Sequence, residues 1–146
     1  MCIRDSSKRA VTGLSMGGHG ALWLAANHPD VFGSAGSMSG GVDIRPFASS
    51  WGMAKLLGKK YSEDPELWTS HTVAGIIPKF KDANINITID CGIDDFFAPV
   101  NDELHHSLVA AKIPHDYTSR PGKHSHAYWA NSVLHHLLFF NTAFQK

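Results

Sequence analysis

The sequence has few cysteines and no long apolar run. It contains two cysteines, Cys2 and Cys91, among 146 residues, and no Cys-x-x-Cys pair. This composition excludes a framework of disulfides and gives no indication of a zinc site. Because a helix that spans a bilayer needs about 20 consecutive apolar residues, the sequence predicts no transmembrane segment. Residues 1–5 also lack the apolar centre of a signal peptide.

An excess of charge of either sign is absent too. Lysine and arginine together number 13, and aspartate and glutamate also number 13. Without a basic field, the chain has no general attraction for nucleic acid or for an anionic membrane, and we expect neither as a partner. Hydrophobic residues make up 43% of the chain, which suffices for the core of one globular domain.

The sequence does contain an alternation of strand and helix patterns. Isoleucine alternates with polar residues over residues 85–90, which is typical of a strand. Strands are predicted at residues 9–12, 32–39, 85–90 and 116–120, and helices at residues 16–27, 53–57, 65–70, 101–111 and 128–144. This order predicts an α/β fold with a mostly parallel sheet and helices on both faces. Ligands of such sheets bind beyond the carboxyl ends of the strands.

Ser15 directly follows the first predicted strand, within the run Gly-Leu-Ser-Met-Gly at residues 13–17. A Gly-x-Ser-x-Gly run between a strand and a helix predicts a sharp turn that exposes the serine hydroxyl to a substrate. We expect side chains at Gly13 and Gly17 to collide across this turn. The backbone N–H of Met16, which opens the helix, would donate to an oxyanion. The alternative is that Ser15 is an ordinary helix cap.

A serine nucleophile needs a histidine base and a carboxylate that orients this base. In α/β-hydrolases the three follow in the order Ser, Asp, His. Asp94 and Asp95 follow the third predicted strand, and His124 and His126 follow the fourth. Spacing alone leaves either aspartate and either histidine open, and loop capping is an alternative role for the acidic pair.

The other histidines have weaker signals. His19 comes just after the predicted turn, and we expect it to face the site. His105, His106, His135 and His136 lie inside predicted helices, where we expect them to be structural, and their spacing predicts no zinc site.

Four segments carry a family resemblance. They are Gly-Leu-Ser-Met-Gly-Gly-His-Gly-Ala-Leu at residues 13–22, His-Pro-Asp-Val-Phe-Gly at 28–33, Asp-Cys-Gly-Ile-Asp-Asp-Phe at 90–96, and Gly-Lys-His-Ser-His-Ala-Tyr-Trp at 122–129. Together they resemble the putative esterase family, which includes esterase D, S-formylglutathione hydrolases, tributyrin esterases, antigen 85 mycolyltransferases, and feruloyl and acetyl-xylan esterases. The resemblance implies an α/β-hydrolase fold. It also implies that Ser15 is the nucleophile, Asp95 the acid and His124 the base.

The resemblance further implies an esterase that works through an acyl-enzyme, without a metal or an organic cofactor. S-formylglutathione hydrolases usually have Gly-His-Ser at the turn, whereas this chain has leucine at position 14. We therefore expect a short-chain or carbohydrate-linked ester as the substrate. S-formylglutathione hydrolase and acyltransferase activities, which use the same triad, are the alternatives. Trp51, Tyr61 and Trp68 are expected either to line a substrate pocket or to pack in a core.

The sheet of this family has several strands before the nucleophile, whereas Ser15 follows the predicted strand 9–12 at once. We therefore expect residues 1–146 to be the C-terminal portion of a single α/β-hydrolase domain, without its N-terminal strands and without the loop that gives the second oxyanion donor. Residues 1–6 are expected to be foreign to that domain. Since a sheet without those strands exposes an edge, an inactive or aggregating chain, or a homo-oligomer, is the alternative to an active monomer.

Overall fold

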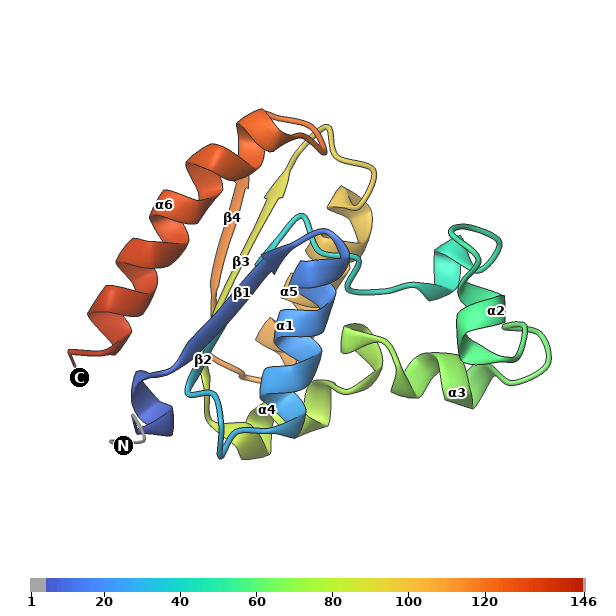
Figure 1. Ribbon diagram of the computed structural model, residues 1–146, viewed down its shortest axis with the longest axis horizontal. Coiled ribbons are helices and arrows are strands. Elements are labelled where there is room, and N and C mark those ends of the chain that lie inside the picture. The colour runs from blue at the N-terminus through green and yellow to red at the C-terminus, as the bar shows by residue number, and fades with distance from the viewer. Residues whose placement is uncertain (1–4, 146) are drawn as a thin grey trace.

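Four parallel strands form the centre of the structure, a computed structural model that describes residues 5–145 (Figure 1). The strands are β1 (Ala10–Leu14), β2 (Ser34–Met38), β3 (Asn86–Gly92) and β4 (Asp116–Arg120), and they lie side by side in this order. Residues 1–4, which include Cys2 and most of the segment expected to be foreign, lie outside the described residues.

Helices cover both faces of the sheet, as predicted. Because parallel strands are joined by right-handed crossovers, three successive connections in one direction place their helices on the same face. That face carries α1 (Met16–Asn27), α4 (Ile77–Ala83) and α5 (Ala98–Ala110), and α6 (His126–Ala143) covers the other. An insert between β2 and β3 holds α2 (Met53–Leu57) and α3 (Pro65–Ser70). Short 3₁₀ turns lie at η1 (Ser6–Lys8), η2 (Arg45–Phe47) and η3 (Val73–Gly75).

The predicted elements agree with the structure in type and differ at some ends. α4 was not predicted, because residues 42–81 have no clear helical period. α5 begins earlier than expected, since Pro99 lies in its first turn, where a missing N–H costs no helical hydrogen bond. β3 extends to Gly92, so Cys91 belongs to the strand and not to the loop that follows.

The main core lies between the sheet and the helices α1, α4 and α5. β2 is buried along its whole length and consists of small residues, so helices on both faces approach it closely. A second apolar cluster under α6 contains Met38, Tyr128 and Trp129, and a third within the insert contains Ile44, Met53 and Trp68. Among the described residues, every helix is too short or too polar to cross a membrane.

The strand register aligns the carboxyl ends of the strands. Leu14 pairs with Met38, Met38 pairs with Asp90, and Gly92 pairs with Arg120. The segments that follow β1, β3 and β4 therefore meet at one edge of the sheet. These are the segments that contain Ser15, Asp95 and His124.

Candidate active site

Ser15 lies on a strained turn between β1 and α1. Its backbone has φ 55° and ψ −121°, a conformation that costs energy for a residue with a side chain. The turn is held by the N–H of Ser15, which donates to the carbonyl of Met38 at 2.9 Å. The Ser15 side chain makes no capping hydrogen bond to α1, so the alternative of an ordinary helix cap is wrong.

Close packing across the turn requires glycine, although at different positions from those expected. A Cβ atom on Gly13 would lie 2.5 Å from the backbone of Gly17, so the collision predicted at Gly13 is confirmed. The collision predicted at Gly17 itself is wrong, since a Cβ atom there would meet nothing within 4 Å. Gly18 is the second crowded position, because its Cβ atom would lie 2.6 Å from the hydroxyl of Ser37.

A chain of hydrogen bonds joins Ser15, His124 and Asp95. The Nε2 atom of His124 lies 3.0 Å from Oγ of Ser15. The Nδ1 atom of His124 lies 2.8 Å from Oδ2 and 3.0 Å from Oδ1 of Asp95. Because the ionised carboxylate only accepts, Nδ1 carries the proton, and the lone pair of Nε2 faces the serine hydroxyl. This arrangement suits removal of the proton from Ser15.

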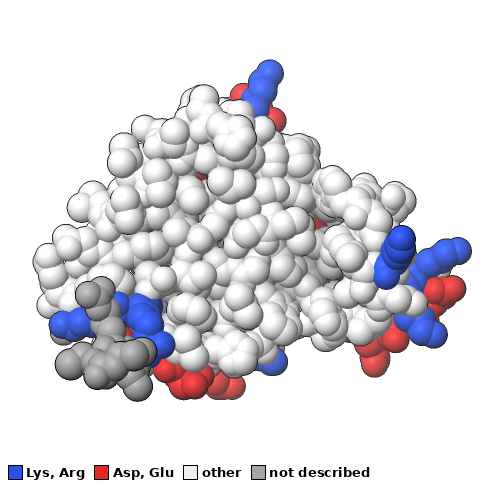
Figure 2. Space-filling view, in the orientation of Figure 1, with Lys and Arg blue, Asp and Glu red and all other residues white. Residues whose placement is uncertain are grey.

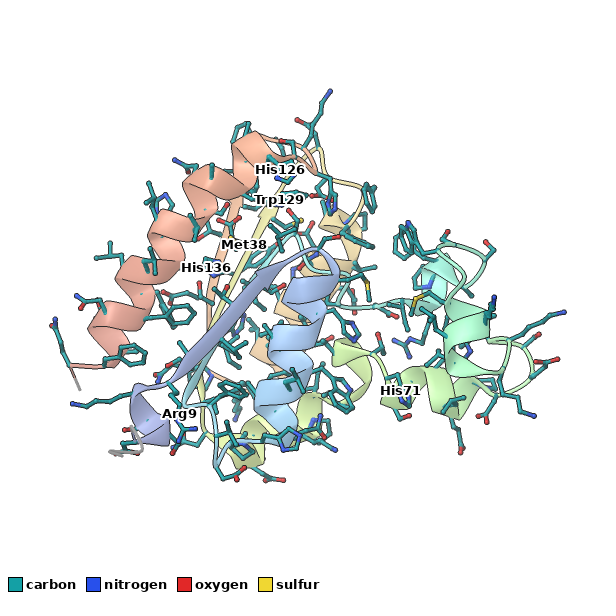
Figure 3. The ribbon with its side chains drawn as sticks, viewed as in Figure 1. Arg9, Met38, His71, His126, Trp129 and His136 are labelled. Carbon is teal, nitrogen blue, oxygen red and sulfur yellow. The ribbon has the colours of Figure 1, made fainter. Side chains whose placement is uncertain are left out.

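The structure distinguishes between the residues that spacing left open. Asp95 is buried, and its Oδ1 also accepts from the N–H of Phe97 at 2.9 Å, which fixes the carboxylate against His124. Asp94 is exposed. His126 is exposed too and packs edge-on against Trp129, with the ring centres 5.2 Å apart. Figure 3 shows His126 and Trp129 in the first turn of α6, near Met38 at the end of β2.

Three aromatic rings surround the imidazole of His124, and the sequence analysis did not assign them to the site. The ring centres of Phe96, Trp129 and Phe97 lie 4.4, 4.8 and 5.5 Å from that of His124. These contacts limit the rotation of His124, whose side chain is 18% exposed. Phe96 and Trp129 lie within the segments that resemble the family, and Phe97 directly follows one of them, which was the available signal.

The N-terminus of α1 lies next to the serine hydroxyl. Met16 is the first residue of the helix, so its backbone N–H has no acceptor within the helix. The positive end of the helix dipole favours negative charge at this point. The predicted position of Met16 at an oxyanion therefore fits the local backbone.

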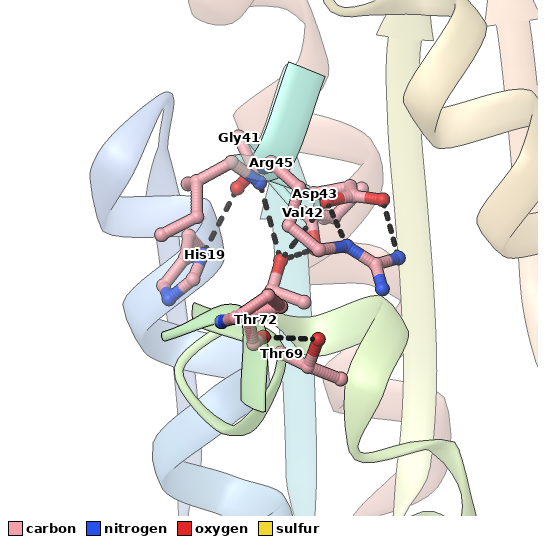
Figure 4. A network of polar contacts seen from close by, with 9 residues as sticks. His19, Gly41, Val42, Asp43, Arg45, Thr69 and Thr72 are labelled. Carbon is pink, nitrogen blue, oxygen red and sulfur yellow. Dashed lines mark hydrogen bonds and ion pairs between the residues drawn. The ribbon is translucent and has the colours of Figure 1, made fainter. Parts of the chain in front are cut away.

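His19 fastens the segment after β2 to α1 (Figure 4). Its Nδ1 donates to the carbonyl of Gly41 at 2.9 Å, and the N–H of Gly41 donates to the carbonyl of Ser15 at 3.3 Å. Burial lowers the pKa of His19, which favours the neutral ring. Val42, in the same segment after β2, accepts from the hydroxyl of Thr72 at 3.0 Å. His19 is thus linked to Ser15 through Gly41, and it holds the backbone beside the nucleophile.

Among the other helical histidines, His136 is structural, as expected, whereas His106 and His135 are exposed. His136 is buried between α6 and the sheet, and its Nδ1 lies 2.8 Å from the hydroxyl of Thr12 (Figure 3). His105 on α5 and His115 share a hydrogen bond of 2.9 Å at the surface. Within residues 5–145, no group of three or more histidine, cysteine, aspartate or glutamate side chains is arranged to hold a metal ion.

The aromatic residues of the insert divide between core and surface. Trp68 is fully buried, and Tyr61 packs edge-on against it at 5.9 Å between ring centres, so packing accounts for both. Trp51 is 54% exposed.

An open depression of about 660 Å³ runs beside Asp95, Phe96 and His124. On the face shown in Figure 2, charged side chains gather over the insert, near η1, along the lower edge and at the top, and the middle of this face is largely uncharged.

Comparison with known proteins agrees with these observations. A family model described as "Putative esterase" matches residues 3–140. The S-formylglutathione hydrolase of Mus musculus is 28% identical over 147 residues, which cover 94% of this chain and 51% of that protein. The enzyme of the same name from Paracoccus denitrificans (strain Pd 1222) is 28% identical over 127 residues, 86% of this chain and 44% of that protein. The chain thus spans about half the length of the curated relatives it matches.

Solved structures show the same fold. FphF, a fluorophosphonate-binding serine hydrolase of Staphylococcus aureus, superposes with a TM-score of 0.83 at 22% identity, covering 94% of this chain and 55% of that one. A ferulic acid esterase superposes with a TM-score of 0.72 at 24% identity, covering 97% of this chain and 53% of that one. The predicted α/β-hydrolase fold is therefore confirmed. Since the family model extends over most of the sequence, this chain belongs to the putative esterase family.

Proposed function

We propose that this chain carries the catalytic groups of a serine carboxylesterase. Ser15 is the nucleophile, His124 the general base and acid, and Asp95 the carboxylate that orients His124. The observation that supports this assignment best is the continuous hydrogen-bond chain, 3.0 Å from Ser15 to His124 and 2.8 Å from His124 to Asp95. The exposed alternatives Asp94 and His126 make no contact of this kind.

The proposed reaction has two steps. In the first, Nε2 of His124 takes the hydroxyl proton of Ser15 while Oγ attacks the ester carbonyl, and the N–H of Met16 donates to the resulting oxyanion. The C–O bond to the alcohol then breaks, the alcohol leaves with the proton from His124, and an acyl-enzyme remains. In the second step, water gives its proton to His124 and attacks the acyl carbon. Ser15 regains the proton as the acid leaves, so no metal or organic cofactor enters the balance.

A single oxyanion donor of this kind contributes about 10²–10³ in rate in serine hydrolases. Positive charge at the start of α1 adds to the effect of the Met16 N–H. The buried Asp95 keeps the proton on Nδ1 of His124 and so keeps Nε2 free to act as the base. We propose short-chain or carbohydrate-linked esters as the substrates of this site.

S-formylglutathione hydrolysis is the second candidate function. Two relatives with this name are each 28% identical to the chain. The same three groups would cleave a thioester, with the thiol leaving in place of the alcohol. A direct comparison of S-formylglutathione with 4-nitrophenyl acetate and an acetylated xylo-oligosaccharide separates the two functions by their kcat/KM values.

A fluorophosphonate probe tests the nucleophile. We expect the 146-residue chain to be labelled once, at Ser15, and Ser15→Ala to lose the label while keeping the circular dichroism spectrum of the parent. Ser125→Ala is the matched control, because Ser125 lies beside His124 in sequence but caps α6 through its bond to the N–H of Tyr128. A folded chain that is not labelled at Ser15 would falsify the proposal.

A further inference from the structure

Four aromatic side chains form a cluster next to His124. The cluster consists of Phe47, Trp51, Phe96 and Phe97. Phe97 lies at its centre, with ring centres 5.1 Å from Phe47, 5.7 Å from Trp51 and 4.5 Å from Phe96. Phe97 also lies close to Gly41, whose N–H donates to the carbonyl of Ser15 at 3.3 Å.

Two rings of this aromatic cluster face solvent. Phe97 is 1% exposed, whereas Phe96 is 49% and Trp51 is 54% exposed. Their ring centres lie 6.2 Å apart, so they form one continuous apolar surface. Large aromatic rings left in water beside a polar catalytic group are a typical feature of a ligand site, because the exposed apolar area is stabilised only when a ligand covers it.

The backbone at Trp51 supports a role beyond packing. Trp51 has φ 51°, and Gly52 after it has φ 66°, so two successive residues are left-handed. This conformation is unfavourable for a bulky side chain. Burial does not compensate for it, because the indole is more than half exposed. Trp68, in contrast, is buried and lies in a regular helix.

The position of His124 defines which part of an ester would meet these rings. In the proposed reaction Nε2 of His124 gives its proton to the leaving oxygen, so the group attached to that oxygen lies beside the rings around His124. Trp129 and Phe97 are buried at 9% and 1% exposure and offer no open face. Phe96, with its ring centre 4.4 Å from that of His124, is the exposed ring of the three, and Trp51 extends the surface away from it.

We propose that Trp51 and Phe96 form a subsite for an aromatic ring on the alcohol side of the ester. The proposal rests on the assignment of His124 as the general acid. Offset or edge-on packing of a substrate ring against two aromatic side chains adds affinity beyond that of the apolar area alone. The preferred substrates are then esters of benzyl-type alcohols.

Two isomeric esters test the direction of this preference. Benzyl acetate carries its ring on the alcohol, and methyl phenylacetate carries the same ring, through the same CH₂ group, on the acyl side. We expect kcat/KM for benzyl acetate to exceed that for methyl acetate by about fivefold to tenfold, and methyl phenylacetate to show no such gain. Trp51→Leu and Phe96→Leu keep apolar bulk without a ring, and each should lower the ratio of benzyl to methyl acetate by about threefold.

Tyr61→Leu is the control variant. Tyr61 is an exposed aromatic residue of the same insert, but it packs on Trp68 and not on the aromatic cluster. The ratio should remain that of the parent in this variant. Three results would each overturn the subsite. They are equal kcat/KM values for benzyl and methyl acetate in the parent, a preference for methyl phenylacetate over benzyl acetate, and an unchanged ratio of benzyl to methyl acetate in Trp51→Leu.

A binding measurement separates this inference from the proposed function. Broadening of the ¹⁹F signal of 4-fluorobenzyl alcohol by the 146-residue chain requires no turnover, and Trp51→Leu should remove it. If Ser15 is not labelled and no ester is hydrolysed, the proposed function fails, and the ring subsite is judged by this signal. Absence of broadening with the parent chain overturns the subsite even when esters are hydrolysed.

Discussion

The Nε2 atom of His124 lies 3.0 Å from Oγ of Ser15, although the two residues are 109 positions apart in the chain. The parallel register explains how they meet. β1 and β4 are separated by two strands, but their carboxyl ends lie at the same edge of the sheet. The segment after β4 then places His124 next to Asp95, which lies in the loop after β3.

Asp95→Asn should lower kcat by about 10³–10⁴-fold. The amide can still accept from the N–H of Phe97, but its NH₂ group would then donate to Nδ1 of His124. This places the imidazole proton on Nε2, facing Ser15, where it blocks proton removal. Asp94→Asn is the matched control and should retain the parent rate, because Asp94 is exposed. A large loss in the Asp94 variant with little loss in the Asp95 variant would reverse the assignment of the acid.

Gly13→Ala should destabilise the chain by about 3 kcal/mol or more, because its Cβ atom would lie 2.5 Å from the backbone of Gly17 and neither backbone can move freely. Gly17→Ala is the control, since a Cβ atom there is in open space. Alanine within the first turn of α1 should instead stabilise the chain by up to about 1 kcal/mol. Urea denaturation of the two variants measures both effects, and equal destabilisation would contradict the packing described for the turn.

Much of the fold could be predicted because its signals are local. Burial of one or both faces of a strand restricts the residues that it can contain. The alternation in residues 85–90 and the small residues of β2 are therefore recognisable in the sequence. That Ser15, the Asp94/Asp95 pair and the His124/His126 pair lie at the carboxyl ends of β1, β3 and β4 followed from the general geometry of parallel sheets. α4 escaped prediction because it has only residues 77–83 and a single buried residue, Phe80.

The choice between neighbouring residues and the role of Trp51 needed the structure. Asp94 and Asp95 differ only in the direction of their side chains, which is set by the loop after Gly92. The family resemblance favoured Asp95, and the bond from the N–H of Phe97 supplies the physical reason. Trp51 lies beside Phe96 and Phe97, which are far along the chain, and such contacts leave no periodic signal in residues 42–81.

His136 should make the stability of the chain depend on pH. Burial lowers the pKa of His136 from 6.5 to about 4. Between these values the unfolded chain binds a proton that the folded chain does not, so the free energy of unfolding should fall as the pH falls through this window, by about 3 kcal/mol in all. Above pH 6.5 the contribution of this residue is constant.

Urea denaturation at several pH values, with His136→Asn beside the parent, checks this dependence. In the His136 variant, the free energy of unfolding should change much less than in the parent between about pH 6.5 and pH 4.5. His135→Asn is the matched control, because His135 is the neighbouring residue on α6 but is exposed. The same dependence on pH in the parent and in the His136 variant would show that His136 is not its source.

Asp90 and Arg120 should be coupled in stability. Their ion pair lies under α6, where the carboxylate of Asp90 is 2% exposed and the guanidinium side chain 24% exposed. The hydroxyl of Ser132 donates to Asp90 at 2.8 Å and accepts from Arg120 at 2.8 Å, so the network joins β3, β4 and α6 just before the loops of Asp95 and His124. Asp90→Asn leaves the guanidinium unpaired at this partly buried position and should destabilise the chain by about 3 kcal/mol.

The double variant Asp90→Asn with Arg120→Met removes both charges and should be more stable than the Asp90 variant alone. An uncompensated charge destabilises more than the loss of the pair does. The summed destabilisation of the two single variants should therefore exceed that of the double variant by more than about 1 kcal/mol. A double-mutant cycle by urea denaturation measures this difference. Additive effects, within about 0.5 kcal/mol, would mean that the two residues act independently and that the strand ends beneath the site are held by other contacts.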